Sequence, residues 1–251
     1  MFLGKSFWPV ILSLVVLALI SSFVVLFKIR ETGYLYLSLL LVLFFSFLWW
    51  RDLTRERLLK GEYRREVRDR LKVGIVLFIL SEVLFFVAWF WGFFHSSLSP
   101  VLELGFVWPP IGLFPLHPFQ IPLLNTLLLL RSGVAVTWAH HNLLLNRDLN
   151  FPMIWTLLCG GLFTFFQGFE YFNTFYSISD RVYGRRFFVS TGFHGLHVLV
   201  GSLFLLFVWN RAVQYHFDSV YHLGFECAIW YWHFVDVVWL FLFSFLYWWR
   251  W

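Results

Sequence analysis

Six ionisable residues inside apolar stretches of the sequence are candidates for buried polar or proton-linked groups, and the most central of them is Glu82. It stands in the middle of the apolar run 71–94, and its helical neighbours three and four residues away are all phenylalanine or isoleucine. A carboxyl group in hydrocarbon costs about 3 kcal/mol on insertion scales, so it needs a compensating contact. Glu82 is therefore either a proton-handling carboxyl or a neutral acid that donates one hydrogen bond to another helix.

The other five residues fall in two later apolar runs. His194 and His197 are three residues apart within a glycine-rich segment. On a helix with about 100° per residue, Glu226 and His233 lie about 20° apart and Asp236 about 60° further round, which predicts one polar stripe facing a bundle interior. We expect a single polar layer joining three helices, either structural or a proton relay, made of Glu82, His197, His233 and Asp236.

Histidines in apolar runs also raise the question of haem or copper. A cytochrome with two haems needs axial histidines about 13 residues apart on one helix, and no run has that spacing. The adjacent pair His140 and His141 points about 100° apart, so these two cannot easily chelate one ion alone. The sequence therefore predicts no metal site and no catalytic residue in this chain.

Composition places the chain in a membrane. Of its 251 residues, 60% are apolar and only 13% are charged, against about 45–50% and 25% in soluble domains. A soluble fold of this size cannot bury so much hydrocarbon. The two cysteines, Cys159 and Cys227, lie inside apolar runs, which excludes a secreted disulfide scaffold. A net charge of +5 does not indicate a nucleic-acid partner, because the basic residues crowd beside apolar runs.

Seven runs are long enough to cross a bilayer as helices. They are residues 7–27, 34–50, 71–94, 121–145, 151–172, 187–209 and 224–249. The first is too long for a signal peptide, and no small-residue cleavage site follows it. The sequence therefore predicts an all-α membrane protein with seven transmembrane helices.

The distribution of basic residues predicts an orientation. The segment 51–72 alone holds nine lysines and arginines, and the side of the N-terminus holds twelve against six on the opposite side. Positive charge accumulates on the inner side of membranes, so we expect the N-terminus inside and the C-terminus outside. The acidic residues of the same segment stand three or four residues from basic ones, which favours helices that extend beyond the membrane.

Several long strings resemble subunit III of the haem–copper cytochrome c oxidases. The likeness runs from about Trp8 to Trp249. The matching strings are Trp49–Glu56, Phe78–Phe86, His95–Leu98, Trp108–Pro110, Pro122–Thr126, Thr137–His141, Phe188–Gly201 and Trp230–Phe241.

The resemblance implies a fold and an organisation. It implies a V-shaped bundle in which a two-helix arm (1–50) is joined by a basic inner linker (51–70) to five helices (71–251). The segment 95–120, which contains five prolines, is expected to form an ordered loop on the outer surface.

The resemblance also implies a function. Subunit III is a helper without a redox centre that packs on the catalytic subunit I, while haem a, haem a3 and copper belong to partner subunits. The implied roles are to hold structural phospholipids, to support proton uptake and O2 access, and to keep the complex stable during turnover. The chain then shares in O2 reduction and proton pumping only as part of the oxidase.

Single positions can be matched as well. Glu82 matches the family's membrane-buried carboxyl, and four residues match positions near inner lipid headgroups: Trp50, Arg51, Arg211 and His222. Arg131 stands where the family usually has a small or apolar residue.

The phenylalanine-rich composition and hydrophobic start fit a protein made inside an organelle. We therefore expect the mitochondrial inner membrane, with the N-terminus in the matrix, ahead of a bacterial plasma membrane. The alternative function is a free-standing proton-coupled transporter that uses Glu82 and the histidines. Such a protein would have helices broken by Gly or Pro at matching places in two halves, whereas most of the prolines here gather in one loop.

Overall fold

The computed structural model describes residues 6–60, 65–100, 102 and 105–249, with the backbone alone at 57–60 and 65. Seven helices in this part of the chain are long and apolar enough to cross a membrane, as predicted. They are α1 (Trp8–Ile29), α2 (Gly33–Lys60), α3 (Arg65–Leu98), α4 (Ile121–Leu144), α5 (Asn150–Asn173), α6 (Arg181–Val213) and α7 (Leu223–Leu242), which continues as the π-helical turn η2 (Phe243–Trp248).

Helices α2, α3 and α6 are longer than the apolar runs that predict them. The charged segment 51–70 is helical at both ends, because α2 continues to Lys60 and α3 begins at Arg65. Three basic residues counted for the orientation, Lys5, Arg64 and Arg250, lie outside the described residues, as do the side chains of Arg57, Lys60 and Arg65.

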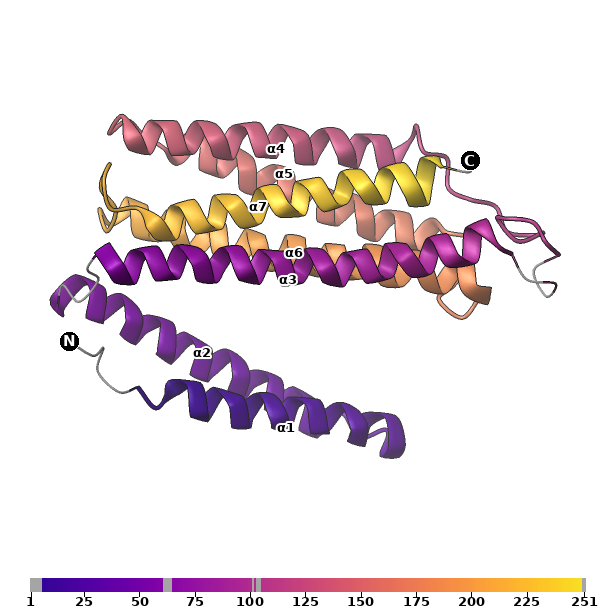
Figure 1. The fold of residues 1–251 in the computed structure, drawn as a ribbon, viewed down its shortest axis with the longest axis horizontal. Helices are drawn as coiled ribbons and strands as arrows, with labels where there is room; N and C mark the ends of the chain where they lie inside the picture. The colour runs from indigo at the N-terminus through magenta and orange to yellow at the C-terminus, as the bar shows by residue number, and fades with distance from the viewer. Residues whose placement is uncertain (1–5, 61–64, 101, 103–104, 250–251) are drawn as a thin grey trace. The chain divides into compact units, whose positions relative to one another are not determined.

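The chain divides into two compact units, and the first comprises Met1–Asp69. In it α1 and α2 pack against each other as a helical hairpin (Figure 1). Two polar contacts tie the hairpin together: the buried hydroxyls of Ser22 and Ser38 lie 3.0 Å apart, and Trp8 Nε1 donates to Asp52 Oδ2 over 3.1 Å. Small residues such as serine let transmembrane helices approach closely.

The second unit, Arg70–Trp251, is a bundle built around α7. Helix α7 packs on α4 and α6, and α5 packs on both α4 and α6. Helix α3 lies along α6 and α7 (Figure 1), where Phe85 packs on Phe193 of α6 with ring centroids 5.0 Å apart.

The centre of this unit is the fully buried indole of Trp232. Its ring lies against two glycines: a Cβ on Gly160 of α5 would meet it at 2.9 Å, and a Cβ on Gly201 of α6 at 3.0 Å. Absence of a side chain at these two positions lets the largest residue type fill the space between three helices.

The proline-rich loop is shorter than the segment 95–120, because α3 continues to Leu98. The described residues between α3 and α4 contain no α-helix. Trp108 anchors the loop to the bundle: it is 7% exposed, and its ring packs on Phe93 of α3 and Tyr183 of α6.

Candidate functional site

The clearest polar pair in the bundle joins Glu82 of α3 to His197 of α6. His197 Nε2 lies 2.9 Å from Glu82 Oε2, and His197 Nδ1 lies 2.7 Å from the Phe193 carbonyl oxygen. A carbonyl oxygen only accepts, so Nδ1 carries a proton. The remaining contact is then either a neutral carboxyl donating to Nε2 or an imidazolium donating to a carboxylate. The pair therefore shares one proton between two atoms.

Aromatic rings surround this pair. The imidazole of His197 lies against Phe86 at 5.1 Å between ring centroids and against Phe234 at 6.1 Å. The side chain of Glu82 is 24% exposed and that of His197 is 12% exposed. Low polarity nearby strengthens the bond between them.

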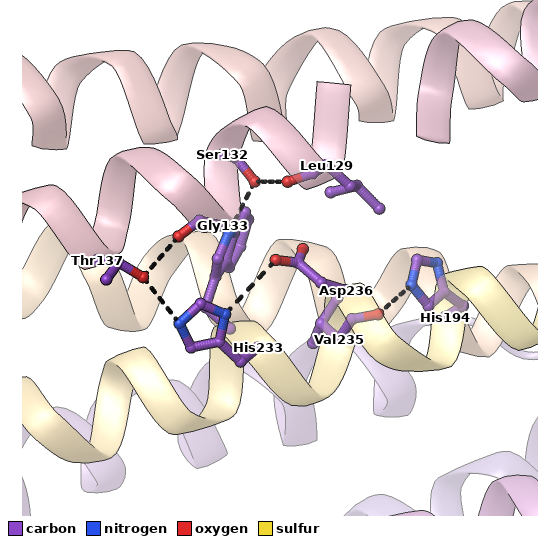
Figure 2. A network of polar contacts seen from close by, with 9 residues as sticks. Leu129, Ser132, Gly133, Thr137, His194, His233, Val235 and Asp236 are labelled. Atoms are coloured by element: carbon purple, nitrogen blue, oxygen red, sulfur yellow. Dashed lines mark hydrogen bonds and ion pairs between the residues drawn. The ribbon is translucent and has the colours of Figure 1, made fainter. Parts of the chain in front are cut away.

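A second polar group lies between α4 and α7 and is drawn in Figure 2. His233 Nε2 lies 3.3 Å from Thr137 Oγ1 of α4, and His233 Nδ1 lies 3.9 Å from Asp236 Oδ2. The second oxygen of Asp236, Oδ1, is buried and has no hydrogen-bond partner in the structure. Such a carboxyl oxygen needs a donor that the described residues of this chain do not supply.

This second group opens onto a groove between α4 and α7. The groove has a volume of about 560 Å³ and is lined by apolar residues of both helices together with Thr137, His141, His233 and Asp236. Because the His233 side chain is 42% exposed, the groove presents polar atoms on an otherwise apolar surface.

The expected single polar layer is therefore wrong in its arrangement. Glu82 and His197 join α3 to α6, whereas His233 and Asp236 face α4 (Figure 2). Among the described residues, no hydrogen bond or ion pair links the two groups. The aromatic ring of Phe234, which packs on both Phe86 and His197, occupies the face of α7 that the layer would need.

The other predicted residues also have defined partners. His194 is completely buried, and its Nε2 lies 3.1 Å from the Val235 carbonyl oxygen of α7 (Figure 2). Glu226 forms an ion pair of 3.2 Å with Lys72 of α3 rather than continuing a stripe with His233. A second contact of 3.2 Å joins Glu226 to His222.

Of the four headgroup candidates, Trp50 and Arg51 are exposed, whereas Arg211 is half-buried with its Nε and Nη2 atoms shielded. Trp50 is 56% exposed, and Arg51 pairs with its neighbour Asp52 at 3.0 Å. Arg211 lies over the Phe217 ring, 4.7 Å from its centre. His222, in contrast, is 6% exposed and is held inside the bundle.

The structure gives Arg131 a partner that the sequence did not indicate. Its guanidinium lies 4.7 Å from the centre of the Trp155 ring on α5. A cation over an indole face gains about 0.5–2 kcal/mol, depending on its solvation, which offsets part of the cost of an arginine inside α4.

One buried acid was missed by sequence reasoning. Glu170 of α5 is 2% exposed, and Tyr247 Oη donates to its Oε1 over 2.6 Å. Gln167, one turn earlier, lies 3.4 Å from Asn125 of α4. The signal was present, because Gln167 and Glu170 are three residues apart and therefore share one helix face.

Comparison with known proteins decides the family. A family model described as "Cytochrome c oxidase subunit III" matches residues 1–251. The chain belongs to the cytochrome c oxidase subunit III family. Cytochrome c oxidase subunit 3 of Rhipicephalus sanguineus is 51% identical over 98% of this chain and 96% of its own length. The Myxine glutinosa and Rattus norvegicus proteins of that name are each 50% identical over 98% of this chain and 95% of their own lengths.

Membership in the subunit III family carries the coarse function. The chain is a subunit of a cytochrome c oxidase, its partners are other subunits of that complex, and the family has no redox centre of its own. A subunit of an oxidase is not a free-standing protein, so the transporter alternative is set aside.

Proposed function

We propose that this chain is a non-catalytic core subunit that supports proton uptake, O2 access and stability of the oxidase during turnover in the mitochondrial inner membrane. Haem a, haem a3 and copper are held by the partner subunits, and this chain packs on the catalytic subunit I and holds structural phospholipids. We assign proton handling to α3 and α6, contact with another oxidase subunit to α4 and α7, and lipid contacts to the ends of α2 and α6.

The shared proton of Glu82 and His197 supports the first assignment most directly. The two atoms that hold it are 2.9 Å apart, and aromatic rings exclude most water from His197. A group of this kind accepts and releases a proton with little movement of the protein. Its role is to buffer the protons that reach the catalytic subunit during turnover.

The variant Glu82→Gln in the assembled oxidase tests this role. Glutamine keeps the size of the side chain and its ability to hydrogen-bond, but it cannot exchange a proton. We expect about a twofold or larger loss in turnover or in protons pumped per electron, or faster inactivation during turnover, at equal subunit content. The matched control is Glu66→Gln, which alters an exposed carboxyl in the first turn of the same helix, α3.

Two results separate a proton-handling role from a structural one. Unchanged turnover, proton stoichiometry and inactivation rate in Glu82→Gln contradict the proposal and leave Glu82 as a structural hydrogen-bonding group. If His197→Gln and Glu82→Gln reproduce each other and the double variant adds nothing, the pair acts as a unit.

We assign the groove between α4 and α7 to the contact with another oxidase subunit. It combines an apolar lining with the partnerless Asp236 Oδ1, and a polar atom within a membrane is stabilised by a donor from a neighbouring helix.

In the assembled oxidase, a cysteine at Val134, which is 73% exposed, should crosslink to a partner subunit. A cysteine at Leu203 of α6, which is 66% exposed, is the control and should not; equal crosslinking of both would contradict the assignment.

The lipid assignment is tested by counting bound phospholipids. An arginine at a membrane surface suits a phosphate group because its guanidinium donates two parallel hydrogen bonds. We expect Arg51→Gln to lose tightly bound phospholipid from the purified complex, by mass spectrometry, and the exposed Arg147→Gln to retain it. The orientation, with the N-terminus in the matrix, is tested by the access of a protease to an N-terminal tag from each side of the membrane.

A further inference from the structure

Three potential metal ligands meet at the end of the bundle where α3 and α7 begin and α4 ends. His140 comes from the last turns of α4, His222 immediately precedes α7, and Glu226 lies in the first turn of α7. One ligand atom of each residue lies within 4.8 Å of the ligand atoms of the other two. These residues belong neither to the Glu82–His197 pair nor to the His233–Asp236 group, and the family comparison assigns them no role.

The orientation of His222 is that of a metal ligand. Its Nδ1 lies 3.1 Å from the backbone carbonyl oxygen of Asp218, so Nδ1 carries the proton and Nε2 is directed at Glu226 Oε1, 3.2 Å away. Histidines that bind metals almost always donate their other ring N–H to a carbonyl or carboxylate, which fixes the tautomer and aims the ligating nitrogen.

His140 supplies an independent observation. Its Nε2 is buried and has no hydrogen-bond partner among the described residues, although its ring lies 5.3 Å from the ring of His222 between centroids. A buried ring nitrogen without a partner costs free energy. A cation bound between the two imidazoles would remove that cost.

We propose that His140, His222 and Glu226 bind a Zn²⁺ ion. Two imidazole nitrogens and one carboxylate oxygen are a donor set that zinc prefers, and a water molecule completes a tetrahedron. With metal–ligand bonds of about 2.0–2.1 Å, tetrahedral ligands lie about 3.4 Å apart. The His222–Glu226 contact of 3.2 Å already has about that spacing. Because no two ligand atoms are more than 4.8 Å apart, closure needs His140 to approach by about 1.4 Å at most.

When zinc is absent, the positive charge beside the Glu226 carboxylate is that of Lys72. Its ammonium lies 3.2 Å from Glu226 Oε2, and it neutralises the carboxylate. A zinc ion bound at Oε1, on the side of His222, would be repelled by this ammonium on Oε2 of the same carboxylate. Removing the charge of Lys72 should therefore strengthen zinc binding rather than weaken it.

The test uses the intact oxidase, dialysed against a chelator and then titrated with ZnCl2. Bound zinc is counted by elemental analysis, and its position is read from anomalous scattering at the zinc edge. We expect one zinc equivalent to be lost, or its apparent Kd to rise by about 10–100-fold or more, in His140→Ala and in Glu226→Gln. The matched control is His141→Ala, which removes an exposed histidine one position along α4 and should bind zinc as the parent does.

Four results overturn the proposal. The first is an anomalous map of the zinc-titrated parent without a peak among the three side chains. The second is equal zinc binding by the parent and Glu226→Gln, which retains the side-chain volume and so guards against loss of folding. The third is weaker binding in Lys72→Gln. Loss of zinc in His141→Ala to the same extent as in His140→Ala would likewise assign the effect to surface histidines.

Discussion

The backbone of Gly133 on α4 lies directly against the Asp236 carboxylate on α7. A Cβ built on Gly133 would be 2.5 Å from Asp236 Oδ2 and 3.6 Å from His233 Nδ1. Real Cβ atoms do not approach so closely, so the Asp236 carboxylate occupies the space that a side chain at position 133 would fill. The polar group drawn in Figure 2 exists in its present form because position 133 has no side chain.

Gly133→Ala should therefore destabilise the bundle. The added methyl group must displace the Asp236 carboxylate, and overpacking of this kind costs about 1–3 kcal/mol. The measurement is the thermal midpoint for loss of this subunit from the purified oxidase. Gly161→Ala is the control, because a Cβ there meets nothing within 4 Å; a shift of the same size in both variants would contradict the explanation.

Ser132→Ala should cost about 1–2 kcal/mol of stability. The indole Nε1 of the buried Trp232 donates to Ser132 Oγ over 2.9 Å, and alanine leaves that N–H without an acceptor. The comparison is Ser244→Ala, whose hydroxyl bonds only the Leu240 carbonyl of its own helix and whose loss should cost less than about 0.5 kcal/mol. Equal midpoints for Ser132→Ala and the parent would show that the indole finds another partner.

Tyr247→Phe should destabilise the bundle where η2 is hydrogen-bonded to α5. Its hydroxyl donates to the buried Glu170 carboxyl over 2.6 Å, and loss of a donor to a buried carboxyl costs about 1–3 kcal/mol. Chemical denaturation of the purified complex measures the change. Tyr36→Phe on α2, where the ring is 63% exposed, should have no effect, and an unchanged Tyr247→Phe would mean that Gln167 alone satisfies Glu170.

A buried tyrosine in the connection between α5 and α6, Tyr176, predicts that the stability of the protein depends on pH. Burial, with Tyr183 and Glu170 nearby, raises the pKa of the Tyr176 phenol well above its ordinary value of 10.0. The folded state therefore holds the proton more tightly than the unfolded state. This contribution to stability is complete below about pH 10 and is lost as the pH rises further.

Tyr176→Phe should reduce the alkaline destabilisation, seen as a smaller fall in the thermal midpoint of the oxidase between about pH 8 and pH 10.5. Tyr215→Phe is the control because its ring is 93% exposed, and it should follow the parent. If Tyr176→Phe loses as much stability at high pH as the parent, other groups carry the effect.

Some features of the candidate site were evident before the fold was known. Glu82 was singled out because a carboxyl in an apolar run is conspicuous, and its need for a partner on another helix followed from its apolar neighbours. That His197 is this partner depends on a contact across 115 residues. Periodicity places residues on a helix face but does not give the rotation of one helix against another, and for this reason the expected four-residue layer was wrong.

The sequence alone determined the number of spans, the apolar surface and the family. Backbone hydrogen bonds must be satisfied within each segment that crosses hydrocarbon, so an apolar run of sufficient length becomes a helix wherever it lies in the chain. Tertiary structure alone decided which polar atoms meet: Glu82 with His197, Glu170 with Tyr247, and His140 with His222 and Glu226. These contacts depend on how closely the helices pack and on how each helix is rotated about its axis. Small residues such as Gly133 and Gly160 leave room for side chains of helices that are distant in the chain.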